Sequence, residues 1–339
     1  MCKYQAPGSF LIDSIEIPQI SSDEILVKTK YVGVCGTDIH KAVHQTVPRG
    51  TILGHEISGI VEAVGDEVTT FAEGDNVAIA HHAPCMSCKQ CLKGHHSLCE
   101  QYLKTNVYPG GFAEYIRLPR ENVKHTVKLM PDGISFQEAA FMEPLACCLR
   151  GFHRLSFDPG DTYLIIGLGP IGMLFCQIAR AFNAKSIIGI EINKKRVAFA
   201  VQNSIVNAAF NPRHGEWSEF KFANNIKNFD HIIISVGLGP VYQDALHYIS
   251  HGSNLLFFAE CPDGQSISIE PNLVYRNELT ILGSYSSSPR FLTMALNMIA
   301  SGRINVAQLI THEFGVDHMK EALETAAKGE DSLKVMIKF

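Results

Sequence analysis

The chain has 339 residues, of which 46% are hydrophobic, enough for a substantial core and, as a starting estimate, about two domains. Its net charge is −5 and it contains no basic run, which argues against a nucleic acid or an acidic membrane surface as its partner. No apolar stretch reaches the ~18 residues of a transmembrane helix, and the N-terminal MCKYQAPGSF lacks the apolar segment of a signal peptide.

The first ~130 residues have the pattern of a β-rich region. Short β-branched runs such as EILVKTKYVGV and ISGIVEAVG alternate with Gly, Pro and Asp. The pattern changes at Ser135, which forms a capping-box signature with Glu138. An apolar helical pattern follows, and we expect Pro144 to kink or interrupt it.

From Thr162 onwards, strands and helices alternate. The runs TYLIIG, SIIGIE, HIIISVG, NLLFFA and ELTILG are typical of buried strands, and PIGMLFCQIARAF, KKRVAFAVQ and DALHYI of helices. This alternation predicts an α/β region with a doubly wound parallel sheet. The last ~50 residues predict two helices (FLTMALNMIASG, HMKEALETAAKG) and a strand (LKVMIKF), which we expect to pack back on the first region.

A glycine-rich loop follows the first strand of this α/β region. Gly167, Gly169 and Gly172 form a G-x-G-x-x-G that, with Pro170 and Ile171, opens a helix. The first glycine permits a tight turn, the second lets a pyrophosphate approach the helix N-terminus, and the third allows close packing of helix and strand. The alternative is a glycine-rich turn in another kind of α/β domain.

Two features bear on which dinucleotide this loop binds. Glu191 ends the second strand, where an acidic side chain hydrogen-bonds the adenosine ribose and repels a 2′-phosphate. Lys194, Lys195 and Arg196 follow, and could instead bind that phosphate. Since Glu191 is directed at the ribose, the sequence favours NAD over NADP.

Four cysteines lie close together in CMSCKQCLKGHHSLC. Cys85, Cys88, Cys91 and Cys99 have the spacing C-x2-C-x2-C-x7-C, which fits the tetrahedral shell of one structural zinc. Because the chain has ten cysteines but no secretory signal, we expect reduced thiols and a cytoplasmic protein.

Three separated segments carry residues that could hold a second, catalytic zinc. Cys35 and His55 supply two ligands, and either Glu56 or Glu143 the third, with the other carboxylate holding water nearby. Such a zinc would polarise an alcohol oxygen and lower its pKa towards neutrality. The alternatives are a buried cysteine, a hydrogen-bonded core histidine and structural acids.

Two further side chains near Cys35 could move the alcohol proton. Thr37 can accept it, and His40, which titrates close to neutral pH, can pass it to solvent. His81 and His82 precede the four cysteines, and we interpret them as loop packing. After the second helix of the α/β region, we expect Asn203 to adopt the left-handed cap.

These motifs together resemble one family. GVCGTDIH, GHE, the four cysteines, GGFAEY (Gly110 to Tyr115), EPLA, the glycine motif and SGRINVAQLITHEF are similar to the zinc-dependent medium-chain dehydrogenases, over nearly the whole length. The resemblance implies a GroES-like catalytic domain (1–152 and 288–339) with a zinc lobe at about 81–102, and an inserted Rossmann domain (153–287). It implies the same catalytic zinc ligands, structural zinc and proton relay as above.

The family resemblance also points to a branch and an assembly. Glu143 in an EPL context resembles the sorbitol and iditol dehydrogenases, whereas threonine dehydrogenases, the main alternative, usually have Asp-Pro there. A non-enzymatic zinc-ribbon module is disfavoured by the absence of a basic stripe. We therefore expect oxidation of a small alcohol or polyol with NAD. The resemblance further implies a homodimer or homotetramer paired along the strand at Glu278 to Gly283.

Overall fold

The computed structural model describes all residues from 1 to 339 and divides them into two compact units. Unit 1 comprises Met1–Ala146 and Ser287–Phe339, and unit 2 comprises Cys147–Ser286. The last part of the chain therefore belongs to the same unit as the first. None of the helices combines the length and the apolar composition needed to cross a membrane.

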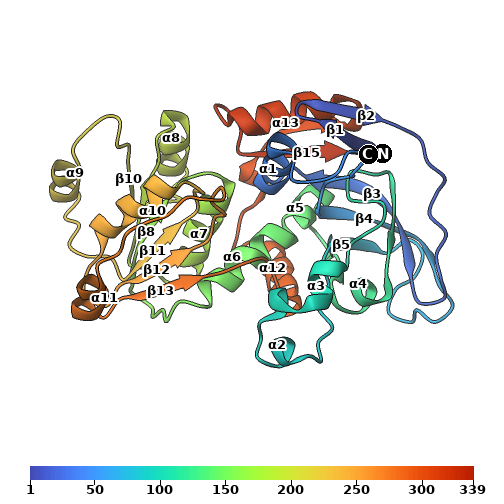
Figure 1. The fold of residues 1–339 in the computed structure, drawn as a ribbon, viewed down its shortest axis with the longest axis horizontal. Coiled ribbons are helices and arrows are strands. Elements are labelled where there is room, and N and C mark those ends of the chain that lie inside the picture. Colours follow the sequence, from blue (N-terminus) through green and yellow to red (C-terminus); the bar gives the residue numbers. More distant parts are fainter. The chain divides into compact units, whose positions relative to one another are not determined.

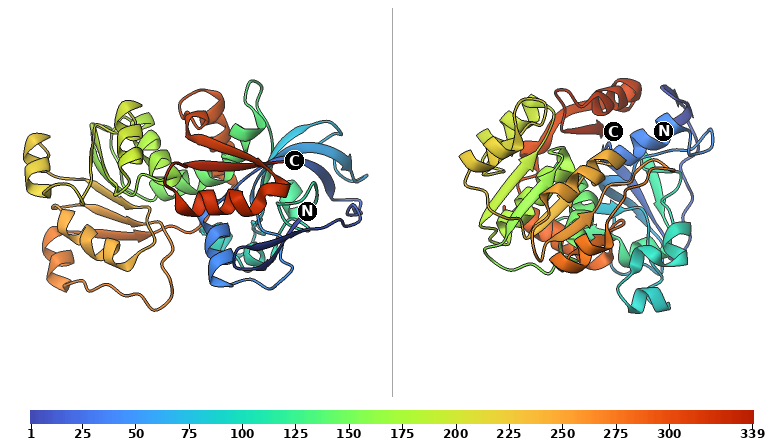
Figure 2. Two further views of the ribbon diagram at one scale, coloured as in Figure 1. Left: turned by 90° about the horizontal axis from the view of Figure 1, so that it is seen from above. Right: turned by 60° about the vertical axis from the view of Figure 1, so that its left-hand side comes forward.

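Unit 1 is built on a seven-stranded sheet in the order β14-β15-β3-β4-β5-β7, with β6 also paired to β3. The C-terminal strand β15 lies antiparallel to β3 and parallel to β14, so the two ends of the chain share one sheet (Figures 1 and 2). The strands are β3 (Ile25–Gly33), β4 (Glu56–Val64), β5 (Asn76–Ala80), β6 (Tyr115–Leu118), β7 (Val127–Leu129), β14 (Ile310–Gly315) and β15 (Lys334–Lys338), beside the small sheet β1 (Cys2–Ala6) and β2 (Ser9–Ile12).

Some helices of unit 1 pack against this sheet, and apolar residues of its strands fill the core. Helix α13 packs against β14 and β15, and α5 against β3 and β4. The helices are α1 (Gly36–His44), α2 (Lys89–Leu92), α3 (Glu100–Lys104), α4 (Arg120–His125), α5 (Phe136–Ala140), α12 (Pro289–Ala300) and α13 (Met319–Lys328).

The helical pattern after Ser135 is interrupted, as Pro144 predicts. Ser135 and Glu138 form both hydrogen bonds of a capping box at the start of α5, which ends at Ala140. Helix α6 (Met142–Phe152) then places Pro144 in its first turn, where a missing backbone N–H costs no intrahelical bond.

Unit 2 contains a six-stranded, wholly parallel sheet in the order β10-β9-β8-β11-β12-β13. This confirms the doubly wound sheet: the chain leaves β8 in one direction through α7 and α8, returns past it through the connection that contains α9, and continues on the other side through α10 and α11 (Figure 1). The elements are β8 (Thr162–Ile166), α7 (Pro170–Ala181), β9 (Ser186–Ile190), α8 (Lys194–Gln202), β10 (Ala208–Phe210), α9 (Trp217–Ala223), β11 (His231–Ile234), α10 (Gly239–Ala245), β12 (Asn254–Phe257), α11 (Pro271–Asn277) and β13 (Thr280–Gly283).

One local prediction in unit 2 is wrong. Asn203 is not left-handed (φ −89°), and Ser204 takes that conformation instead (φ 54°). Helix α8 continues through Gln202, so the residue that must reverse the chain lies one position later. The side-chain amide of Asn203 instead donates to the Phe199 carbonyl at 2.9 Å and caps the last turn.

Candidate metal and dinucleotide sites

Three side chains from two neighbouring segments of unit 1 converge on one point. The potential ligand atoms of Cys35, His55 and Glu56 all lie within 4.8 Å of one another. Cys35 is the N-cap of α1, directly after β3, while His55 and Glu56 stand at the start of β4. Because β3 and β4 are antiparallel partners, the end of one strand meets the beginning of the other.

Asp38, which sequence reasoning missed, organises this cluster from behind. Its Oδ1 lies 3.3 Å from His55 Nδ1 and accepts the Gly54 N–H at 3.0 Å. Its Oδ2 accepts the Cys35 N–H at 3.0 Å and so completes the capping box of α1. The available signal was an acidic residue three positions after Cys35, the N3 position of a capping box.

Asp38 and His55 shift each other's pKa in this buried pair. Burial by itself would raise the pKa of Asp38 and lower that of His55, but the attraction between them and their hydrogen bonds outweigh it, and Cys35 adds to the effect on His55. The pKa of Asp38 is therefore lowered and that of His55 raised well above its usual value. With Nδ1 turned to Asp38, the imidazole has Nε2 left for a ligand, the arrangement usual for metal-binding histidines.

Glu56 is fully buried and pairs through Oε2 with the ammonium of Lys334, a second residue that sequence reasoning missed. Lys334 comes from β15 and also donates to the Val34 carbonyl at 3.1 Å. A Cβ on Gly33 would lie 2.0 Å from Glu56 Oε2, so only glycine leaves room for this carboxylate. The other oxygen, Oε1, is buried without a hydrogen bond.

A thiolate, an imidazole and a carboxylate oxygen lacking a hydrogen bond make a donor set that fits zinc. The donors come from Cys35, His55 and Glu56, and a three-residue set leaves a position for substrate or water. Glu143, the other candidate, is buried in the first turn of α6 and is not a member of this group.

The expected relay residues Thr37 and His40, and a further histidine, His81, lie around the Cys35 cluster. Thr37 lies in the first turn of α1, with its backbone N–H 3.5 Å from Cys35 Sγ, and the His40 ring lies 4.5 Å from the His44 ring. His81, interpreted above as loop packing, instead has its ring 4.9 Å from the ring of His55. Burial, reinforced by His82, His55 and Lys41, lowers the pKa of His81 well below its usual value.

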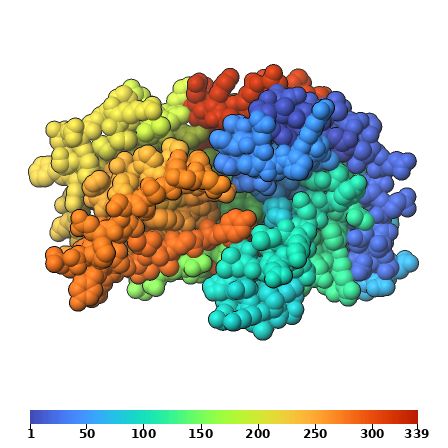
Figure 3. All heavy atoms as spheres, in the orientation of Figure 1, coloured from blue at the N-terminus to red at the C-terminus, as the bar shows by residue number.

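The four cysteines after β5 form a separate cluster on unit 1. Cys85 Sγ lies 3.5 Å from Cys99 Sγ and 3.9 Å from Cys91 Sγ. Four sulfurs at ~2.3 Å from a common centre would be about 3.8 Å apart, so this spacing fits a tetrahedral zinc. The only buried side chains of the lobe's own core are Cys91, Cys99 and Tyr102, and the lobe projects from unit 1 (Figure 3).

In unit 2, the glycine loop between β8 and α7 is shaped by contacts that exclude side chains. Gly167 has a positive φ of 94°, and a Cβ on Gly172 would lie 1.8 Å from the Gly167 carbonyl oxygen. Gly169 differs, since a Cβ there would meet only the Arg196 side chain, at 3.5 Å. Its open surface, ahead of Pro170 and Ile171 at the N-terminus of α7, fits the close approach of a pyrophosphate.

Glu191 lies directly after β9 and is held by backbone groups. Its Oε2 accepts the Leu168 N–H at 2.9 Å, and its Oε1 accepts the Asn193 N–H at 2.8 Å. The Arg196 guanidinium is 4.0 Å from Oε2. The carboxylate is therefore fixed next to the glycine loop, with a cation beside it.

Comparison with known proteins identifies the family of this chain. Residues 21–131 match the family model described as the alcohol dehydrogenase GroES-like domain, and residues 170–301 match the zinc-binding dehydrogenase model. The chain belongs to the zinc-dependent medium-chain dehydrogenases. Its resemblance is to the sorbitol dehydrogenase-like branch of that family.

Three relatives illustrate the similarity. A sorbitol dehydrogenase of Bacillus subtilis is 29% identical over 96% of this chain and 93% of its own. The D-xylulose reductase A of Aspergillus oryzae is 31% identical over 95% and 91%, respectively. Among solved structures, galactitol-1-phosphate dehydrogenase from Escherichia coli has a TM-score of 0.88 at 27% identity, covering 100% of this chain and 99% of its own.

Family membership fixes the class of reaction for this dehydrogenase. It is a zinc-dependent oxidoreductase that acts on a small-molecule alcohol. It uses a nicotinamide dinucleotide, and dehydrogenases of this fold have been solved with NADH and with NADP.

Proposed function

We propose that this dehydrogenase oxidises a secondary alcohol of a polyol or sugar alcohol to a ketone and transfers the hydride to NAD. The single observation that carries the proposal is the buried Cys35, His55 and Glu56 cluster backed by Asp38. When bound, zinc lowers the pKa of an alcohol hydroxyl, and NAD accepts the hydride from the alcohol carbon. The sorbitol and D-xylulose relatives support a polyol substrate.

In the proposed site, Cys35, His55 and Glu56 would hold the catalytic zinc, and the Oε1 oxygen of Glu56 is free of other hydrogen bonds. Asp38 fixes the ring of His55, and Lys334 fixes the other oxygen of Glu56. Glu143 is the alternative third ligand, and as a buried acid it otherwise hydrogen-bonds substrate or water. Zinc retained in Glu143→Ala but lost in Glu56→Ala would support this assignment, and the reverse result would exchange the two roles.

Thr37 accepts the proton of the alcohol, and His40 passes it to solvent. Both lie on α1, whose N-cap is Cys35, so the helix that positions the metal ligand also positions the relay. Thr37→Val keeps the shape of the side chain but removes the hydroxyl, so turnover should fall strongly while zinc remains bound. His40→Ala should cost at most the ~10²–10⁴-fold typical of a proton-transfer group, since water can replace it.

We also propose the residues of the structural zinc site, the bounds of the two domains and the residues that bind the dinucleotide. The structural zinc binds Cys85, Cys88, Cys91 and Cys99. Residues 1–152 and 288–339 form the catalytic domain with its lobe at about 81–102, and residues 153–287 form the NAD-binding domain. There the pyrophosphate would be held by Gly167, Gly169, Pro170, Ile171 and Gly172, while Glu191, with Arg196 beside it, would select NAD.

The assembly we propose is a homodimer or homotetramer in the cytoplasm. Strand β13 is an outer strand of its sheet, and its Ile281 is 37% exposed. An apolar open edge invites pairing, which a two-fold axis would satisfy by joining β13 to β13 of a second copy. A monodisperse monomer in light scattering at micromolar concentration would contradict this.

The decisive experiment is an NAD-reduction screen over polyols, inositols, sugar acids, threonine and simple alcohols, with zinc content measured in parallel. We expect the highest kcat/KM with a polyol, and none in Cys35→Ala. A clear preference for threonine would replace the polyol assignment with an amino-alcohol dehydrogenase. A wild-type preference for NADP would overturn the role given to Glu191.

A further inference from the structure

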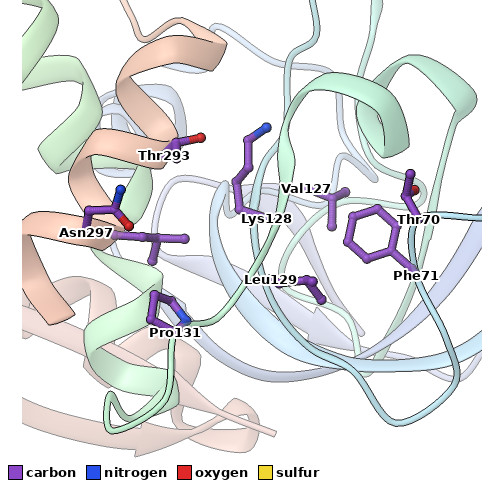
Figure 4. Close-up of a pocket in the computed structure, with 9 residues that line it drawn as sticks. Thr70, Phe71, Val127, Lys128, Leu129, Pro131, Thr293 and Asn297 are labelled. Carbon is purple, nitrogen blue, oxygen red and sulfur yellow. The ribbon is translucent and has the colours of Figure 1, made fainter.

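A cavity of about 250 Å³ lies in unit 1 and contains none of the residues assigned above to zinc or the dinucleotide. Its walls come from the segment before β5, from β7 with the residues that follow it, and from α12 (Figure 4). Phe71 and Leu296 supply apolar surface, while Lys128, Thr70, Thr293 and Asn297 supply polar groups. The cavity therefore has both an apolar lining and a cluster of hydrogen-bond donors.

The donors come from elements distant in sequence. Thr293 and Asn297 are one helical turn apart on the exposed side of α12, next to the buried Leu296. In Figure 4 both extend from the helix towards the segment that carries Lys128, and Thr70 and Phe71 lie on the far side of that segment. Lys128 is fixed by the pairing of β7 with β5, where it lies opposite Ala78.

Lys128 carries a positive charge with no acidic side chain to balance it. It is half-buried, and burial is the sole cause that lowers its pKa, with no carboxylate raising it. The nearby His125, whose own pKa is lowered first by burial and then by Lys128 and Lys124, already pairs with Glu121 at 3.7 Å. In a chain of net charge −5, a half-buried cation left without a counter-ion is a place where an anion would be stabilised.

We propose that this cavity binds the carboxylate of a small organic acid. The carboxylate accepts hydrogen bonds from the Lys128 ammonium and from the Thr293 and Asn297 side chains on the same side of β7, and the apolar body packs on Leu296. A monoanion matches the single cation, whereas a phosphate dianion would leave a charge unpaired. The volume is below the ~300–1,000 Å³ of pockets for drug-sized ligands, so the acid is small.

The test uses the zinc-loaded, full-length enzyme and benzoate as the probe, with benzamide as its uncharged counterpart. Binding is followed by saturation-transfer NMR titration. We expect saturable benzoate binding that weakens about ten- to a hundredfold in Lys128→Met, the loss of one hydrogen bond to a charged group. Lys124→Met, an exposed lysine of the preceding helix, is the matched control and should leave benzoate binding unchanged. Benzamide should bind weakly and equally to wild type and Lys128→Met.

Three results would overturn the proposal: no saturable benzoate binding, equal affinities in wild type and Lys128→Met, or displacement of benzoate by the alcohol substrate. The last would place the acid at the zinc site. If Lys128→Met fails to fold, the double variant Thr293→Val with Asn297→Leu, which leaves the ammonium in place, takes its role and should also weaken benzoate but not benzamide. Alcohol oxidation should be unchanged in these variants, so failure here leaves the proposed dehydrogenase activity untouched.

Discussion

The two metal clusters of unit 1 differ in almost every physical respect. The lobe draws its ligands from a single stretch, and its sulfurs contact mainly one another and nearby backbone N–H groups. The Cys35 cluster mixes donor types, lies deeper, and is backed by charged partners on both sides. Several leucines of the lobe are exposed, Leu92 at 78%, whereas the Cys35 cluster stands at the edge of the main core.

The difference shows how one fold can use one metal site to stabilise the chain and another to carry out catalysis. Four identical thiolates fill all four coordination positions of a zinc ion and leave none for substrate. Such a site can only have a structural role. A mixed three-residue set needs outside help to stay in place, and Asp38 and Lys334 provide it.

The largest effect is expected from Cys35→Ala. Activity should fall below detection and zinc content should drop from about two per chain to about one, because the lobe keeps its own ion. The measurements are NAD reduction and metal analysis of the purified protein. Loss of both ions, or full activity in metal-free protein, would show that the two clusters do not have separate roles.

Cys91→Ser should produce the opposite pattern. The lobe has almost no core of its own, so loss of its zinc should unfold it locally and lower the melting temperature by several degrees. The catalytic zinc and turnover per folded molecule should persist, because no ligand of the other cluster comes from this stretch. One zinc per chain in wild type, unchanged in this variant, would contradict a metal in the lobe.

Lys334→Met tests the ion pair behind Glu56. Removing one partner of a buried pair costs about 3–5 kcal/mol, so metal-free protein should lose that much stability in urea unfolding. Zinc-loaded protein should lose less, because the ion supplies Glu56 with another positive charge. The control is Lys338→Met on the same strand, whose exposed pair with Glu313 of β14 contributes less than about 1 kcal/mol. Equal losses with and without zinc would mean that Glu56 is not a ligand.

Asp38→Asn keeps the size of the side chain but removes its charge. Replacement of such an outer partner typically costs 10–100-fold in metal affinity or activity, and we expect a reduction in that range with the fold intact. Asp66→Asn, an exposed residue, is the control. An unchanged zinc dissociation constant and unchanged kcat/KM would show that His55 needs no support from this carboxylate.

The sequence predicted what depends on local spacing and missed what depends on distant pairing. The four lobe ligands span fifteen residues, from Cys85 to Cys99, and the apolar strands of unit 2 are continuous runs, so both could be predicted. Lys334 meets Glu56 only because β15 returns to the N-terminal sheet, which no local pattern specifies. Helix α1 was missed because its N-cap is a cysteine rather than the usual Ser, Thr, Asp or Asn.

The smallest effect concerns thiol reactivity in the metal-free lobe. Hydrogen bonds from the backbone and hydroxyl of Ser87 lower the pKa of Cys85 to about 6, while burial raises the pKa of Cys91 to about 12. Because the thiolate is the nucleophile, Cys85 should be alkylated by iodoacetamide at neutral pH, with a rate that rises through about pH 6, and Cys91 should not. Peptide mapping by mass spectrometry from about pH 5 to about pH 9 measures both.

Ser87→Ala removes the hydroxyl, which lies 3.6 Å from Cys85 Sγ, but keeps the backbone N–H. The reactivity midpoint of Cys85 should therefore move upwards and still stay below that of an ordinary thiol. Zinc should suppress alkylation of all four lobe cysteines in both proteins, because it holds each sulfur as a ligand. Equal reactivity of Cys85 with and without zinc would show that these sulfurs hold no metal, and the contrast between the two clusters would then rest on the Cys35 site alone.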